Sequence, residues 1–76
     1  MHKISLENII KIISKNINEP ISNINIKSNS DDFDRWDSLS HIRIIIELEK
    51  INGRKINTSK YGELTSVKAI LEYLNK

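Results

Sequence analysis

The sequence predicts a small all-α protein, and three observations lead to this fold class. Apolar residues recur at the i, i+3, i+4, i+7 spacing of amphipathic helices in separate segments of the chain. No segment shows the alternation of apolar and polar residues that is typical of a strand, and a long polar connection follows the first helical segment. We therefore expect residues 1–76 to form a single domain, a four-helix bundle with three main helices, one short helix and a long loop between helices one and two.

The first helix is predicted from about Lys3 to Asn16. Its apolar positions, Leu6, Ile9, Ile10, Ile13 and Ile17, lie on one face, and charged residues lie on the other. Pro20 cannot continue the helix because it lacks the backbone N–H.

Residues 18–37 are rich in Asn, Ser and Asp, which predicts a long loop. We expect Ile21, Ile24 and Ile26 to anchor it, with one short helical turn near residues 31–33. A loop of this length in a small domain is commonly functional. It leads directly into the stretch RWDSLSH, residues 35–41.

The second helix is predicted from Ser38 to about Ile51, since Asn52 and Gly53 tolerate the left-handed backbone found at helix ends. Four of its residues, Ile42, Ile44, Ile45 and Leu48, form one broad apolar face. Leu39 and Ile46 lie beyond the edge of this face. The apolar arc spans roughly 220°, about twice the width that a core-facing stripe requires. Part of it must therefore contact something other than the core.

A short third helix is predicted from Ser59 to Glu63, after a polar connection anchored by Ile56. The fourth helix begins after an N-cap at Thr65 or Ser66. Its apolar positions are Val67, Ile70, Leu71 and Leu74. Tyr73 is expected at the edge of this face with its hydroxyl toward water.

Composition excludes several kinds of chemistry. The chain has no cysteine, so disulfides, thiolate metal sites and a cysteine nucleophile are excluded, and any thiol chemistry needs an added group. Two histidines do not predict a metal site. The formal charge of +2 is a mild imbalance, from which we expect no nucleic-acid binding. With no membrane span and no secretory signal, we expect no membrane association and a cytoplasmic location.

Ser38 admits three interpretations from its neighbours alone. Asp37 or Ser38 is a good N-cap for the second helix. Ser38 and His41, three residues apart beside Asp37, could form a hydrolytic site, but there is no G-x-S-x-G elbow, and His41 is expected to be a solvated helix residue. In the third interpretation Ser38 is an attachment point, because a helix N-terminus favours a phosphate ester.

The stretch WDSLSHIRIIIELEKING resembles the second helix of the acyl carrier and peptidyl carrier protein family. Asp37, Ser38 and Leu39 match the Asp-Ser-Leu motif of that family. The segment from Glu47 to Glu49 is similar to the family's ALEE segment, Gly53 and Ile56 to the following loop, and LTSVKAILEYL to the last helix. The resemblance covers the whole chain in helix order and spacing.

The resemblance implies that the Ser38 hydroxyl receives 4'-phosphopantetheine from coenzyme A through a separate Mg-dependent phosphopantetheinyl transferase. The thiol of that arm would hold an acyl or aminoacyl group as a thioester. The protein would then be a free-standing, monomeric carrier and not an enzyme. Its partners would be the transferase, a loading ligase for acyl or aminoacyl groups, and downstream acyl-using enzymes.

The resemblance also implies a partner surface on the second helix. Leu39 and Ile46 would be its apolar contacts, framed by the charged side chains Arg43, Glu47, Glu49 and Lys50. Typical fatty-acid carriers are acidic along this helix, and this chain is not, so we expect a specialised pathway. Arg35 and Trp36 stand where glycine and a small residue are usual, and Trp36 either packs over the loop or flanks the arm.

A rival interpretation is a small basic helical module that binds nucleic acid or a protein partner. Its contacts would be Arg43, Lys50, Arg54 and Lys55. Such binding would weaken steeply with salt and would not depend on Ser38.

Overall fold

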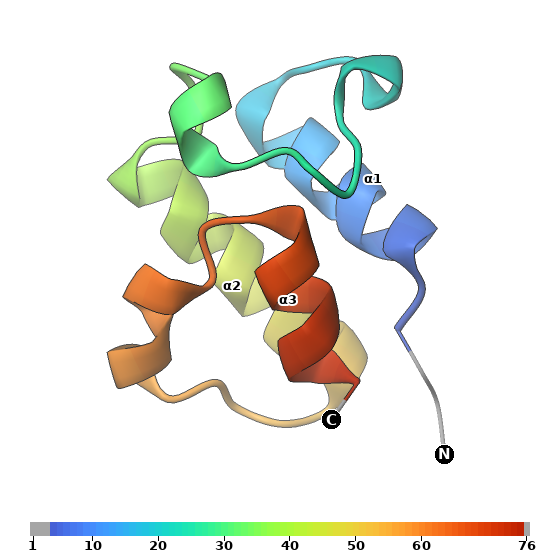
Figure 1. Cartoon of the computed structure of the whole chain (residues 1–76). Helices are drawn as coiled ribbons and strands as arrows, with labels where there is room; N and C mark the ends of the chain where they lie inside the picture. Colours follow the sequence, from blue (N-terminus) through green and yellow to red (C-terminus); the bar gives the residue numbers. More distant parts are fainter. Residues whose placement is uncertain (1–3, 76) are drawn as a thin grey trace.

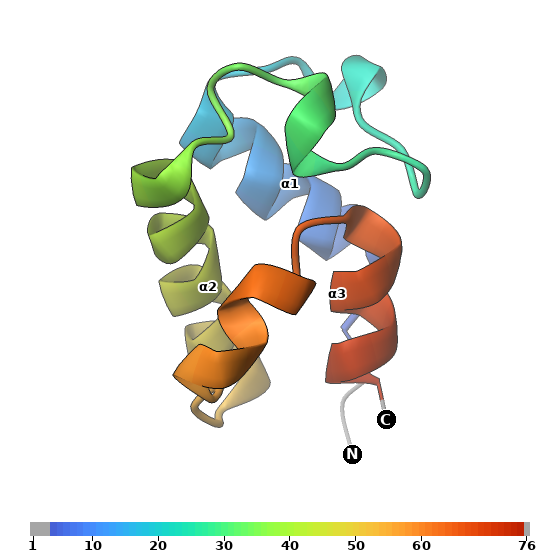
Figure 2. The same cartoon turned by 60° about the vertical axis from the view of Figure 1, so that its left-hand side comes forward.

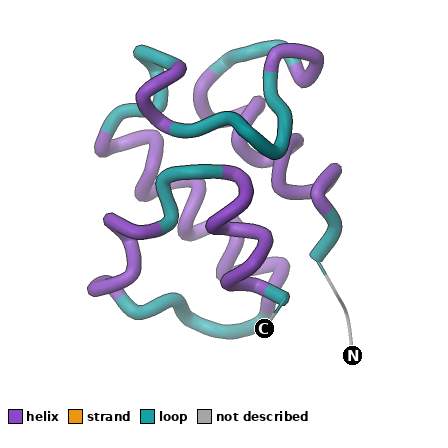
Figure 3. The backbone as a smooth tube through the Cα atoms, in the orientation of Figure 1, coloured by secondary structure: helices purple, strands orange, loops and turns teal. Residues whose placement is uncertain are grey.

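Residues 4–75 are described by a computed structural model, and they form the predicted all-α bundle. Its α-helices are α1 (Leu6–Ile17), α2 (Ser38–Asn52) and α3 (Val67–Leu74). Shorter 3₁₀ helices lie between them: η1 (Ile21–Asn23), η2 (Ser30–Asp32) and η3 (Thr58–Glu63). Figures 1 and 2 show the long loop crossing one end of the bundle, and Figure 3 shows no strand in the part of the chain that is described.

The first helix begins later than its pattern predicted. Ser5 has extended backbone and its hydroxyl accepts a hydrogen bond from the Asn8 N–H at 3.1 Å, so it is the N-cap and Leu6 is the first helical residue. The predicted start at Lys3 lies outside the described residues. The helix ends at Ile17 because Asn18 adopts the left-handed conformation, with φ 56°.

The core is formed by the inner faces of the three helices and by a few residues of the connections. It contains Ile4, Ile9, Ile13, Ile17, Ile24, Trp36, Ile44, Ile45, Leu48, Ile56, Leu64, Val67, Ile70 and Leu74. Leu71 and Tyr73 are partly buried against it. At this protein's size such a core is thin, so each fully buried isoleucine contributes substantially to stability.

The isoleucines of α2 and of the long loop differ in burial, and two of the three predicted loop anchors were wrong. Within α2, Ile42 is 45% exposed, while Ile44, Ile45 and Leu48 are buried on the side of the helix that faces the core. In the loop, Ile24 is buried, but Ile21 and Ile26 are exposed. Ile21 lies in η1 and Ile26 in a turn, where the backbone runs along the surface.

The long loop is tied to the start of α3 by backbone hydrogen bonds. The Ser30 N–H donates to the Thr65 carbonyl at 2.8 Å, and the Val67 N–H donates to the Ser28 carbonyl at 3.0 Å. These bonds flank an isolated antiparallel bridge between Asn29 and Ser66. The predicted helical turn lies close to its expected place, as η2. The loop therefore has a fixed path beside α3.

The remaining helix ends are determined by capping residues. α2 starts at Ser38 as predicted and ends at Asn52, with Gly53 in the left-handed conformation at φ 73°. Ser66, one of the two predicted caps, accepts from the Ala69 N–H at the start of α3. At its end, the Asn75 side chain accepts from the Ile4 N–H and donates to the Ile4 carbonyl, at 3.1 and 3.0 Å.

None of the helices within residues 4–75 combines the length and the apolar character needed to cross a membrane.

Candidate functional site

Ser38 is the first residue of α2, and its side chain is exposed. The preceding Asp37 has extended backbone, and its carboxylate Oδ1 accepts from the Ser40 N–H at 2.9 Å. This hydrogen bond keeps the pKa of Asp37 below its ordinary value. Asp37 is therefore the cap of α2, and capping does not use the Ser38 hydroxyl.

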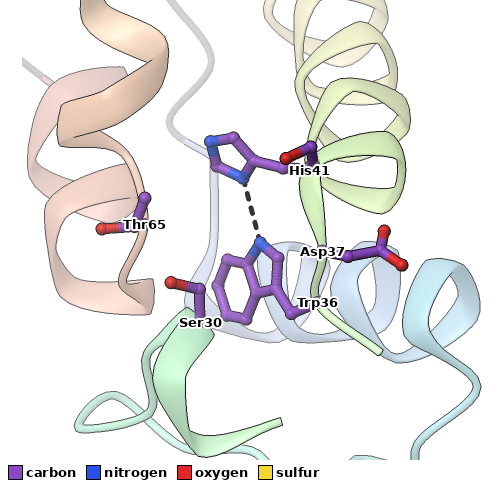
Figure 4. A pocket seen from close by; sticks show the side chains of 6 residues that line it. Ser30, Trp36, Asp37, His41 and Thr65 are labelled. Carbon is purple, nitrogen blue, oxygen red and sulfur yellow. Dashed lines mark hydrogen bonds between the residues drawn. The ribbon is translucent and has the colours of Figure 1, made fainter. Parts of the chain in front are cut away.

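A shallow cavity of about 250 Å³ adjoins Ser38. It is lined by Ser30, Trp36, Asp37, Ser38, His41 and Thr65. Figure 4 shows Ser30, Trp36, His41 and Thr65 around one space, while the Asp37 carboxylate points away from it. The walls come from Ser30 of η2, from residues just before and within the first turn of α2, and from Thr65, two residues before α3. The backbone hydrogen bonds between the loop and the start of α3 therefore help to shape the cavity.

Trp36 and His41 form a hydrogen-bonded pair at the side of this cavity. The Trp36 indole Nε1–H donates to His41 Nδ1 at 2.9 Å, as Figure 4 shows, and His41 Nε2 lies 2.7 Å from the Tyr61 carbonyl oxygen. Because an indole N–H can only donate and a carbonyl can only accept, the neutral imidazole with its proton on Nε2 satisfies both bonds. His41 thus links α2 to η3 and to Trp36.

This arrangement corrects the expectation that His41 is an incidental solvated residue. Trp36, for which two positions were left open, is buried, with 4% of its surface exposed. Its indole packs into the core and forms one wall of the cavity.

The same geometry does not support a hydrolytic triad at Ser38. Both ring nitrogens of His41 are occupied, so no lone pair is available to take the Ser38 proton. The Asp37 carboxylate bonds to the backbone of Ser40 and not to the imidazole.

The surface of α2 that leads away from Ser38 is partly apolar. Leu39, Ile42 and Ile46 are 59%, 45% and 44% exposed. Arg43 and Lys50, two of the predicted partner contacts, are also exposed. The structure therefore brings Leu39, Arg43, Ile46 and Lys50 to one accessible side, and it adds Ile42.

The two predicted acidic partner contacts are placed differently. Glu47 binds Lys15 of α1 at 2.8 Å and accepts from Asn16 Nδ2 at 2.6 Å. The hydrogen bond from Lys15 is the main cause of a lowered pKa at Glu47. Glu49 accepts from the Ile56 N–H at 2.7 Å. Both carboxylates are thus partly buried and hydrogen-bonded within the protein.

Sequence reasoning missed three residues of the site: Ser30, His41 in its bonded role, and Thr65. A buried tryptophan needs a partner for its N–H, and this was the signal that could have identified His41 one helical turn away. No local signal relates Ser30 to Thr65, because only the folded loop brings them together.

Neither the protein-family models nor the curated proteins with which the chain was compared gave a match.

Proposed function

We propose that this protein is a free-standing carrier protein of the acyl and peptidyl carrier type, with 4'-phosphopantetheine attached to Ser38. The observation that carries the proposal is the exposed Ser38 hydroxyl at the start of α2. This hydroxyl is not used to cap the helix, because the Asp37 carboxylate is the cap. The motif resemblance around Asp37, Ser38 and Leu39 supports the same function.

The residues around Ser38 fit a phosphodiester. The first turn of α2 provides the positive end of a helix dipole, which favours a nearby negative charge by about 0.3–1 kcal/mol. The adjoining cavity is lined by two further polar residues, Ser30 and Thr65. Exposure of Ser38 gives a modifying enzyme access to its oxygen.

In the attachment reaction the Ser38 oxygen forms a bond to the phosphorus next to the pantetheine of coenzyme A. The diphosphate P–O bond breaks, and the adenosine bisphosphate leaves with the electron pair. The hydroxyl proton must go to a base of the transferase, since both nitrogens of His41 are occupied. The arm supplies a thiol, which a chain without cysteine lacks, and that thiol holds an acyl or aminoacyl group as a thioester.

The proposal implies a cytoplasmic, monomeric carrier that is itself no enzyme. It serves a phosphopantetheinyl transferase, a loading ligase and downstream enzymes. The cations on α2 favour a specialised pathway over fatty-acid synthesis, because enzymes tuned to an acidic helix would bind this one poorly.

Intact-mass spectrometry tests the proposal. The protein is incubated with coenzyme A, Mg²⁺ and a broad-specificity phosphopantetheinyl transferase, and we expect the mass to rise by one phosphopantetheine group. Ser38→Ala should abolish the gain, while the matched control Ser40→Ala, on the same turn of α2, should keep it. No gain in the wild type, or a gain that persists in Ser38→Ala, would refute the proposal. Loading with fatty acids and with amino acids then distinguishes an acyl from an aminoacyl carrier.

A second candidate function is nucleic-acid binding. Arg43, Lys50, Arg54 and Lys55 are all exposed along α2 and the connection after it. Fluorescence anisotropy with labelled DNA and RNA at two salt concentrations tests this candidate. It requires salt-sensitive binding that is identical in wild type and Ser38→Ala.

A further inference from the structure

The outer face of α2 carries apolar and cationic side chains and no carboxylate. We define it by five exposed residues: Leu39, Ile42, Arg43, Ile46 and Lys50. Their spacing of three or four residues places them along one side of the helix. Apolar side chains occupy the end near Ser38 and the middle, and Lys50 lies at the far end.

The cationic character results from how the carboxylates of α2 are used. Glu47 is turned toward Lys15 and Asn16, and Glu49 toward the Ile56 N–H. Neither Arg43 nor Lys50 lies within ion-pair distance of a carboxylate in residues 4–75. Glu47 lies close enough to Lys50 for the two charges to interact, but it is hydrogen-bonded to Lys15 and Asn16. A partner that covers the outer face would therefore meet two cations that form no ion pair within the described residues.

An enzyme that acts on Ser38 is placed next to one end of this face. Leu39 is the next residue, and Ile42 lies one helical turn further along. From Ser38 to Lys50 the helix rises by about 18 Å. That length falls within the footprint of an ordinary protein interface, which is about 800 Å² on each partner.

We propose that the outer face of α2 docks into an apolar groove edged by carboxylates on the enzyme that modifies Ser38. The inference rests on the proposed carrier function and adds the sign of the partner's charge. Leu39, Ile42 and Ile46 enter the groove, and Arg43 and Lys50 pair with its acidic edge. Such complementarity mainly raises the association rate and excludes partners with basic edges.

The charges around Ser38 favour a protein partner over a membrane or a nucleic acid. Asp34 and Asp37 are exposed just before the outer face begins. An extended surface of lipid phosphates or a nucleic-acid backbone would meet these carboxylates together with the two cations. A protein groove can place its acidic side chains beside Arg43 and Lys50 alone.

The test is a charge swap across the interface. One broad-specificity phosphopantetheinyl transferase is prepared in two forms, with glutamates or with lysines along the edge of its carrier groove. The kcat/KM of Ser38 modification is measured for wild type, for Arg43→Glu/Lys50→Glu, and for the matched control Lys11→Glu/Lys68→Glu. The control makes the same change in net charge on exposed positions of α1 and α3.

We expect wild type to react about tenfold faster with the glutamate form, and the α2 variant to prefer the lysine form. The control should follow wild type within about twofold, and the preferences should shrink as salt screens the charges. No preference, the opposite preference, or an equal effect in the control would overturn the inference while leaving the carrier function intact.

Two other outcomes are distinguishable. If neither enzyme form modifies Ser38, the proposed function itself fails. If wild type binds vesicles containing anionic phosphatidylglycerol, or duplex DNA, and Arg43→Glu/Lys50→Glu does not, the outer face recognises an anionic surface and the inference is wrong.

Discussion

His41 determines more of the local structure than its place next to a serine suggested. Its two ring nitrogens hold the Trp36 indole and the Tyr61 carbonyl. It thereby fixes the wall of the cavity beside Ser38 and attaches η3 to α2. The imidazole is a structural connector in this protein and leaves the Ser38 hydroxyl to an external base.

Replacing His41 with alanine should destabilise the protein by about 1–3 kcal/mol, because a buried indole N–H and a carbonyl both lose their partner. Urea denaturation followed by circular dichroism measures this loss, and the emission of Trp36 should shift to the red as water reaches it. Arg43→Ala, two residues further along and exposed, is the control and should change stability by at most about 0.5 kcal/mol. An unchanged urea midpoint in His41→Ala would contradict the described hydrogen bonds.

Asp37 should make stability depend on acid pH. The Ser40 N–H lowers the folded-state pKa of Asp37 below 3.8, so its charged form is stabilising above the unfolded pKa. This stabilisation is lost as the pH falls through the lower, folded pKa. Asp37→Asn keeps an N-cap without the charge. The stability difference between wild type and Asp37→Asn should be present at about pH 6 and should shrink toward about pH 2.5 in urea titrations. A stability difference between wild type and Asp37→Asn that grows as the pH falls would contradict the lowered pKa of Asp37.

For single residues, the sequence predicted features that depend on neighbouring residues in the chain, and it missed contacts with residues far away in the chain. The start of α2 at Ser38 was predicted from chemistry within one helical turn, although only the structure assigns the cap to Asp37 and not to Ser38. The second partner of His41, the Tyr61 carbonyl, lies twenty residues away, and nothing in the local pattern points to it.

Among the elements, α1 and α2 are joined by a polar connection in addition to their apolar contact. Glu47 lies between Lys15 and Asn16 of α1, and its side chain is only 26% exposed. A partly shielded carboxylate with two hydrogen bonds should contribute more than a solvated ion pair.

Glu47→Ala should therefore destabilise the bundle by about 1–2 kcal/mol. The matched control is Glu7→Ala, which removes an exposed i, i+4 pair with Lys11 and should cost at most about 0.5 kcal/mol. Denaturant unfolding of both variants measures the contrast. Equal losses of unfolding free energy in the two variants would mean that Glu47 stabilises the protein no more than an exposed ion pair does.

Helix positions were predictable because the apolar period and the capping residues lie within the helix or beside its ends. The path of the long loop was less predictable. Periodicity identifies an apolar face but does not say how much of it neighbouring elements cover, so it could not show that Ile42 would be exposed. Composition identified a loop in residues 18–37 but could not tell that Ile24 alone among its three expected anchors would be buried.

For the molecule as a whole, stability depends on a core with many isoleucines and little depth. Ile45 is fully buried, whereas its neighbour Ile46 is 44% exposed. The two positions differ in burial and not in chemistry, so they offer a direct measure of what the core contributes.

Ile45→Val should cost about 1 kcal/mol and lower the Tm by about 4–8 °C. Ile46→Val should leave the Tm almost unchanged, because the deleted methyl group lies at the surface. Thermal unfolding by circular dichroism compares the two variants. Similar Tm values for both would show that α2 is not packed as described.

The hydrogen bonds between distant segments also suggest an order in which parts of the fold form. The helices form from neighbouring residues, but Ser30 meets Thr65 only when a long stretch of chain closes, and Asn75 meets Ile4 across 71 residues. The entropy lost on closure rises by only about 0.6 kcal/mol for each doubling of length. The loop should therefore attach to α3 after α1 and α2 have formed, and the two ends should join at little further cost. We therefore expect the wall of the cavity beside Ser38 to form late in folding.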